Sequence, residues 1–225
     1  MNKELLILTI KRCLFLFIGV NIMTLGVALI MKAEIGVQPW DVFHQGLSSK
    51  LGISFGQASI YVGYCILALS ALIKIFPGPG TIFNIMYMGI AIDIMMPLVP
   101  VAPNFYIGVI MNVSGAIILA AGTALYLKST YGAGARDALI MGIVHKYKKD
   151  TKFVKPAIEA VVLITGIILG GNFGVGTFIS LIFVGYFIDI FFNIFQFDPK
   201  ITKQMTFLDF FNKEKGILAN EDSSN

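Results

Sequence analysis

Residues 26–41 read GVALIMKAEIGVQPWD, and residues 122–137 read GTALYLKSTYGAGARD. At a constant offset of 96 the two stretches share six residues, among them a lysine, a glycine and the final aspartate. The same offset extends without a gap over residues 12–98, where it gives 18 identities in 87 positions. Apolar composition alone would give about half that number or less, because few residue types dominate such a chain. The sequence is therefore interpreted as two tandem copies of one unit.

Composition places both copies in a membrane. The chain has 225 residues, of which 56% are hydrophobic and 13% charged, and its mean hydropathy is +0.81. A soluble domain carries a charged fraction of about 25%. The lipid bilayer is therefore the expected partner, and the net charge of +4 gives no reason to expect nucleic acid. Cys13 and Cys65 lie in apolar runs without metal-ligand spacing, so neither a metal nor a cofactor is expected.

Each copy contains three apolar runs of nearly the length that a membrane-spanning helix needs, about 20 residues. The six predicted spans cover residues 13–31, 56–75, 81–98, 106–127, 154–171 and 177–196. Two shorter stretches, 39–47 and 136–145, follow the first span of each copy. As helices they would reach only about 15 Å at 1.5 Å per residue, which is half a bilayer.

Both short stretches begin like helices that enter a membrane without crossing it. Glycines precede each of them, Pro39 stands near the first helical position, and Asp41 and Asp137 fall in the first turn. Proline and a carboxylate are both favoured there. A glycine-rich break before a half-length helix is typical of a re-entrant segment, which is tolerated where it is buried in protein or lines a cavity. The predicted fold is an all-α membrane protein with six transmembrane helices and two re-entrant half-helices.

Positive charges orient this arrangement. With six spans and both termini in the cytoplasm, 15 of the 17 lysines and arginines fall inside, and only Lys32 and Lys50 fall outside. This excess agrees with the positive-inside rule. Since three spans per copy is an odd number, the two copies are expected to be inverted relative to each other. The first repeat is expected over residues 1–104, the second over 105–201, and a polar cytoplasmic tail over 202–225.

A rival topology stays open at this point. If the short stretches also crossed, the chain would have eight segments and parallel copies, with 13 positive residues inside and four outside. Charge therefore does not decide between the two topologies. Helix length favours six spans, because a half-bilayer helix should not cross.

Asp93 and Asp189 occupy matched positions inside long apolar runs. A carboxylate in a span costs about 2.5–3.5 kcal/mol at the span's centre and usually faces a cavity or a partner. In the six-span topology Lys32 lies near Asp93 and Lys128 lies near Asp189, so each copy is expected to close its own ion pair. Whether these residues only hold the helices together or bind a solute or an ion stays open.

The starts of the half-helices carry the other candidate site residues. Asp41 and Asp137 have a structural explanation, because a first-turn carboxylate complements the helix dipole. The alternative is that the free N–H groups of each half-helix hold a carboxylate or a phosphate. Trp40 in the first copy corresponds to Arg136 in the second. One half-helix would then begin with an aromatic side chain and the other with a cationic one, which would suit an amphiphilic or anionic ligand.

Four further matched residues predict architecture. Thr81 and Thr177 follow glycines and are expected to be the N-caps of the third and sixth spans. Gly89 and Gly185 are expected to let neighbouring helices pack closely.

The run 26–47, together with Gly52-Ile-Ser-Phe-Gly56, Gly78-Pro-Gly80-Thr81 and Asp93, resembles the YczE/YyaS/YitT group of bacterial membrane proteins. The resemblance covers residues 12 to about 195, and it is closest to the YczE branch because no soluble C-terminal domain is expected. It implies an integral membrane protein of bacteria with a role in transport. It carries no assigned site residues over to this chain.

The expected function is secondary transport of a small polar or anionic solute across the bacterial cytoplasmic membrane. Asp93, Asp189 and both half-helix starts would face a central path between two copies that rock against each other. The alternative is an integral membrane accessory or regulatory protein that transports nothing. A membrane-embedded enzyme acting on lipid is disfavoured, because no nucleophile, base and metal set converges, so the chain is not expected to be an enzyme. A homodimer is compatible with each of these functions.

Overall fold

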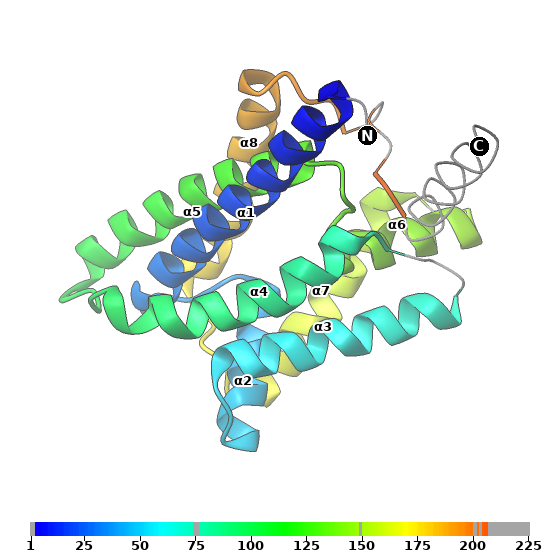
Figure 1. The fold of residues 1–225 in the computed structure, drawn as a ribbon. Helices are drawn as coiled ribbons and strands as arrows, with labels where there is room; N and C mark the ends of the chain where they lie inside the picture. Colours follow the sequence, from blue (N-terminus) through cyan, green and yellow to red (C-terminus); the bar gives the residue numbers. More distant parts are fainter. Residues whose placement is uncertain (1–2, 74–76, 149, 200–201, 203, 207–225) are drawn as a thin grey trace, which may run out of the picture.

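The computed structural model describes residues 3–73, 77–148, 150–199, 202 and 204–206, and Figure 1 shows its fold. Every regular element in these residues is a helix. The elements in chain order are α1 (Lys3–Lys32), α2 (Pro39–Leu51), α3 (Phe55–Leu72), α4 (Pro79–Met95), the short 3₁₀ helix η1 (Met96–Leu98), α5 (Phe105–Lys128), α6 (Ala135–Tyr147), α7 (Thr151–Ile168) and α8 (Val175–Ile194). Nearly all of the predicted tail, 202–225, lies outside the described residues.

Five of these helices are long and apolar enough to cross a membrane: α1, α3, α4 with η1, α5 and α8. Helix α7 has the same 18-residue length as α3 but is not among them. Three charged residues, Lys152, Lys155 and Glu159, interrupt the apolar character of its first half. The expected fifth span, 154–171, is therefore a helix that begins three residues earlier and starts in charged sequence.

Apolar side chains cover the outside of the helices, as contact with lipid requires. Leu72, Tyr106 and Ile168 are 77%, 79% and 75% exposed, on three different helices. A water-soluble protein rarely exposes large contiguous apolar patches. The fold is thus that of a helical membrane protein with several spans.

Helices α2 and α6 are the two half-length elements, with 13 residues each. They are longer than the predicted stretches 39–47 and 136–145, yet their length of about 20 Å still falls short of a hydrocarbon core of about 30 Å. Helix α2 ends where Gly52 turns left-handed at a φ of 65°, and α6 ends in the same way at Lys148, with a φ of 50°. Both half-helices therefore stop by the same backbone turn.

The helix bounds recur at the offset found in the sequence. Subtracting 96 from the bounds of α6 and α7 gives 39–51 and 55–72, which are the bounds of α2 and α3. Subtracting 96 from the bounds of α8 gives 79–98, which α4 and η1 cover together. The helices that follow α1 therefore recur in the same order and with matching bounds after α5.

Helices α1 and α5 cross closely, side by side in Figure 1, because glycines let their backbones touch. A Cβ atom added to Gly26 would lie 2.7 Å from the carbonyl oxygen of Gly115, and one added to Gly19 would lie 3.0 Å from that of Gly122. Residue 19 precedes 26, whereas 122 follows 115. The two helices therefore run antiparallel where they cross.

The connectors that follow α1 and α5 are each tied to the other half of the chain. Gly36 and Gly132 have φ angles of 113° and 128°, which residues with a side chain rarely adopt. Gly36 lies against the backbone of Gly174, and Gly132 lies against that of Gly78. Two matched hydrogen bonds accompany these contacts, from the N–H of Gly176 to the oxygen of Ile35 at 2.7 Å and from the N–H of Gly80 to the oxygen of Tyr131 at 2.9 Å.

The two halves differ where their last two long helices meet. Helices α3 and α4 pack together, with Gly56 against the backbone of Gly89. Helices α7 and α8 make no comparable contact in the described part of the chain, and a Cβ atom built on Gly185 meets nothing within 4 Å. The predicted close packing is therefore confirmed at Gly89 and wrong at Gly185.

The predicted capping threonines lie inside their helices. The N-caps of α4 and α8 are Gly78 and Gly174, three residues before Thr81 and Thr177. The hydroxyl of Thr81 donates to the oxygen of Ala133 at 2.5 Å, and that of Thr177 accepts from the N–H of Gly174 at 3.3 Å. The N-cap prediction is wrong because the residues between each glycine and its threonine are already helical.

Substitution of Gly26 by alanine tests the crossing of α1 and α5. The added Cβ would lie 2.5 Å from the backbone nitrogen of Leu119, so the helices must separate. We expect a loss of about 1–3 kcal/mol, as for other overpacked cores, although alanine by itself favours a helix by about 1 kcal/mol. Thermal unfolding of the purified protein in a single detergent measures the difference. The control Gly185→Ala should not lower the unfolding midpoint, and equal midpoints for both variants would contradict the crossing.

Candidate functional site

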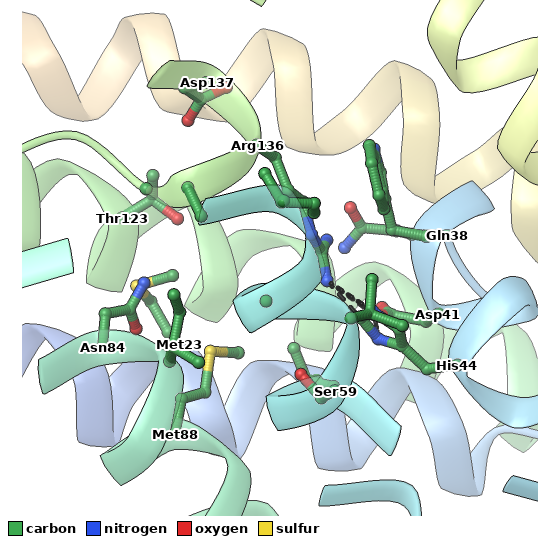
Figure 2. A pocket seen from close by; sticks show the side chains of 18 of the residues that line it. Met23, Gln38, Asp41, His44, Ser59, Asn84, Met88, Thr123, Arg136 and Asp137 are labelled. Atoms are coloured by element: carbon green, nitrogen blue, oxygen red, sulfur yellow. Dashed lines mark hydrogen bonds and ion pairs between the residues drawn. The ribbon is translucent and has the colours of Figure 1, made fainter. Parts of the chain in front are cut away.

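A cavity of about 240 Å³ lies inside the bundle, and each of the eight α-helices in the described residues contributes to its wall. The first turns of both half-helices border it. Figure 2 shows Arg136 reaching from α6 toward Asp41 and His44 of α2, with Gln38 close by. Pockets for drug-sized ligands usually measure about 300–1,000 Å³. The cavity therefore has room for a small solute.

Neither half-helix start has a side-chain cap. The N-cap residues of α2 and α6 are Gln38 and Gly134, and neither accepts a hydrogen bond from the first turn. Helices α3, α5 and α7, by contrast, are capped by Ser54, Asn104 and Asp150. The first N–H groups of α2 and α6 are thus free of side-chain caps at the cavity wall, where such groups favour an anion.

Arg136 lies at the centre of the polar part of the cavity. Its guanidinium nitrogen Nη2 is 3.8 Å from Oδ1 of Asp41 and 3.4 Å from Nδ1 of His44. Its guanidinium carbon lies 5.0 Å from the ring centroid of Trp40, a cation–π distance. The polar contacts are long for hydrogen bonds, which usually measure about 2.7–3.2 Å. The guanidinium can therefore offer donors to a bound solute.

The cavity is built from matched positions of the two halves. Gly134, Arg136 and Asp137 line it, and so do the residues 96 positions earlier, Gln38, Trp40 and Asp41. The same relation joins further lining residues in the pairs Met23 and Leu119, Val27 and Thr123, His44 and Ile140, Ser59 and Lys155, Gly63 and Glu159, and Met88 and Val184. The cavity thus lies between the halves, and apart from Asp41 and Asp137 these matched positions carry different side chains.

The lining residues of the two halves differ in their exposure to solvent. Among the lining residues only Asp137 and Lys155 are exposed, and both belong to the second half. Their counterparts Asp41 and Ser59 are buried and half-buried. The cavity is therefore more open on the side where α7 and α8 stand apart.

Four of the eight residues predicted for the solute path line this cavity: Trp40, Asp41, Arg136 and Asp137. The sequence had matched Trp40 with Arg136, and the structure brings them together as one cation–π pair. The other four, Lys32, Asp93, Lys128 and Asp189, do not line it. Both first-turn carboxylates lie where predicted, in the first turns of α2 and α6.

Asp93 does not pair with Lys32. It binds the start of α3. Its Oδ2 accepts from the hydroxyl of Ser54 at 2.5 Å, and its Oδ1 accepts from the N–H of Gly56 at 2.8 Å. Ser54 is also the N-cap of α3. The carboxylate therefore joins α4 to α3, and the predicted ion pair with Lys32 is wrong because both carboxylate oxygens have other partners.

Asp189, the counterpart of Asp93, is exposed. Lys128 donates to the oxygen of Phe195 at 2.8 Å, so its predicted ion pair with Asp189 is also wrong. The positions matched to Ser54 and Gly56 hold Asp150 and Lys152, which pair with each other at 3.0 Å. The charged pair at the start of α7 thus replaces the hydroxyl and amide that receive Asp93 in the first half.

The site residues that the sequence did not single out are His44, Gln38, Asn84 and Glu159. His44 is 1% exposed and lies one turn after Asp41, an i, i+3 spacing on α2 that could have drawn attention to it. Glu159 matches Gly63, so the repeat gave no sign of a charged site there. Among the described residues no three His, Cys, Asp or Glu side chains are arranged to hold a metal ion.

Comparison with known proteins assigns this chain to a family. A family model described as "Family of unknown function (DUF6198)" matches residues 10–193. The uncharacterized membrane protein YczE of Bacillus subtilis is 30% identical over 187 residues, which cover 82% of this chain and 85% of YczE. The uncharacterized protein YyaS of the same organism is 27% identical, over 80% of this chain and 91% of YyaS.

A third relative, an uncharacterized protein of Haemophilus influenzae, is 28% identical over 85% of this chain and 88% of its own length. No solved structure matches the chain. The predicted resemblance to YczE and YyaS is confirmed.

Cysteine labelling tests the unequal access to the cavity. In a background with Cys13 and Cys65, both exposed, replaced by serine, Lys155→Cys should react several-fold faster with a polar thiol reagent than Ser59→Cys. Position 155 is exposed and position 59 is half-buried, although they are matched positions of the two halves. Mass spectrometry of the purified protein gives both rates. Equal rates, or a faster reaction at position 59, would contradict the described conformation.

Proposed function

The chain belongs to the DUF6198 family, and we propose that it is a secondary transporter that carries a small polar or anionic solute by alternating access. The observation that carries this proposal is the cavity around Arg136, where two half-helix starts without side-chain caps meet. Broken or half-length helices whose N-termini point at a solute recur in transporters built from inverted repeats. Ionisable residues inside a membrane usually mark a solute or ion path.

The proposed architecture is an inverted pair of repeats, each with three spans and one re-entrant half-helix. In it α7 is the fifth span, and its charged start lies at the cytoplasmic edge of the bilayer. The antiparallel crossing of α1 and α5 supports the inversion, because matched helices of inverted repeats run in opposite directions. The excess of lysine and arginine on one side supports cytoplasmic termini in a bacterial cell membrane.

The difference between the halves supports alternating access. Helices α3 and α4 are closed on one side, with Asp93 bound to the start of α3, while α7 and α8 stand apart on the other. If the halves exchange these arrangements, α7 and α8 close and α3 and α4 separate. The cavity would then open to the other side of the membrane. In the proposed topology the described conformation is the one open to the cytoplasm.

Ligand-dependent stability of the purified protein tests the function directly. A solute that the site binds, present at a concentration of 100 times its dissociation constant, should raise the free energy of unfolding by about 2.7 kcal/mol. Arg136→Gln should abolish the stabilisation by the solute, measured against the variant's own unfolding midpoint without solute. The stabilising solute should then exchange across proteoliposomes in counterflow. A non-transporting accessory protein predicts neither stabilisation by a small solute nor counterflow.

A reversible crosslink tests the proposed gate. Cysteines at positions 54 and 93 should form a disulfide readily, because the side chains of Ser54 and Asp93 touch in the described conformation. The crosslinked protein should lose counterflow, and a reducing agent should restore it. The matched pair Asp150→Cys with Asp189→Cys should crosslink only when the halves exchange arrangements. Undiminished counterflow in the fully crosslinked protein would exclude the gate.

A further inference from the structure

Asp41 and His44 form a buried ionisable pair in the cavity wall. They lie one turn apart on α2, with Nδ1 of His44 3.7 Å from Oδ1 of Asp41. The histidine is 1% exposed and the aspartate 4%. The dipole of α2 accounts for a carboxylate in its first turn, but it gives no reason for a buried imidazole beside it.

One positive charge faces this pair. Nη2 of Arg136 lies 3.8 Å from Asp41 and 3.4 and 3.5 Å from the two ring nitrogens of His44. Helix α6 also contributes Asp137 to the cavity, and α7 contributes Lys155 and Glu159. These three are exposed or half-buried, and α1, α3, α4, α5 and α8 contribute no charged lining residue. At the buried end of the cavity, around Asp41, His44 and Arg136, the positive charge of the arginine therefore cancels the negative charge of the aspartate while the imidazole is neutral.

A solute anion changes this balance. If an anion accepts hydrogen bonds from Arg136, the buried end of the cavity holds two negative charges, those of Asp41 and the anion, and one positive charge. Water reaches this place poorly. An uncompensated buried charge is unfavourable, and a titratable neighbour responds by changing its protonation state. A proton taken up from water by the Asp41–His44 pair restores neutrality, and no bond of the solute changes. Anion and proton then favour each other's binding.

The rest of the wall narrows the class of anion. The guanidinium offers paired N–H groups that match the two oxygens of a carboxylate. Much of the remaining wall is apolar, with Met23, Val27, Met88, Leu119 and Val184 among its residues. The volume of about 240 Å³ suits a small molecule with a single charged end. A monocarboxylate with a short apolar part meets all three conditions.

We infer that the Asp41–His44 pair is the proton-binding site of a proton-coupled carrier of small monocarboxylates. This rests on the proposed function, because it names the solute class and the coupling ion of the same cavity. The carboxylate binds Arg136, the proton binds the pair on α2, and the two cross the membrane together. A pH gradient that is acidic outside drives uptake.

Direct measurement of proton uptake on the unmodified protein tests the coupling. Acetate, lactate, butyrate and benzoate are the probes, and each is mixed with weakly buffered purified protein containing a pH indicator. We expect stabilisation by at least one probe and an uptake of about one proton for each anion bound. Above the titration range of the proton site, the apparent dissociation constant should rise about tenfold for each pH unit.

The variant Asp41→Asn mimics the neutral state of the carboxylate permanently. It should bind the carboxylate equally well at pH 6 and pH 8, take up no proton on binding and retain counterflow. It should lose accumulation driven by a pH gradient. The control Glu34→Gln changes an exposed carboxylate that does not line the cavity, and it should keep the pH dependence of the unmodified protein.

The outcomes separate the coupling from transport itself. Carboxylate binding that takes up no proton, or a pH dependence that survives in Asp41→Asn, overturns the coupling and leaves the proposed transport standing. Counterflow of a cation or a neutral solute, with no binding of any of the four probes, overturns the monocarboxylate class. Absence of both binding and counterflow for every class of solute overturns the proposed function.

Discussion

A helix that stops within a bilayer leaves the N–H groups of its first turn where lipid cannot satisfy them, and the rest of this structure depends on that constraint. Helices α2 and α6, with 13 residues each, are too short to cross. Their starts must therefore be enclosed by other helices or face a polar cavity. Both conditions hold, because the eight α-helices of the part that the structure describes surround a cavity that both starts border.

Enclosing two half-helices requires the longer helices to come close together, and the glycines serve this need. Gly19 and Gly26 of α1 meet Gly122 and Gly115 of α5 at backbone distance, so the helices next to the cavity cross without intervening side chains. The connectors after α1 and α5 then pass tightly over the other half, at Gly36 and Gly132. These contacts occur in matched pairs. The glycines that recur at the offset of 96 are enough to specify them.

The parts of the fold that depend on matched residues could be predicted from the sequence. The half-helices, their first-turn carboxylates and the close contact at Gly89 all follow from residues that recur at the offset of 96. The failures come where matched residues have different neighbours. Asp93 finds Ser54 and Gly56, but at the positions matched to these two the second half holds Asp150 and Lys152. Comparing the two halves of one sequence at a fixed offset cannot reveal that Asp93 and Asp189 have different partners. The partner of each aspartate depends on which helices pack together.

The cavity combines likeness of backbone with difference in side chains, and this combination is what a directional carrier needs. Trp40 and Arg136 are matched, as are His44 and Ile140, so the two half-helices present different chemistry to a solute in the same place. If the residues at matched positions were identical, a solute would meet the same groups from both sides and nothing would tie its movement to another ion. Because α2 carries the Asp41–His44 pair and α6 supplies Arg136, an anion bound at the arginine in the proposed carrier would act on a titratable pair from the other half. In the proposed carrier, the similar backbones of the halves would let them exchange arrangements, and the unequal side chains would couple that exchange to what is bound.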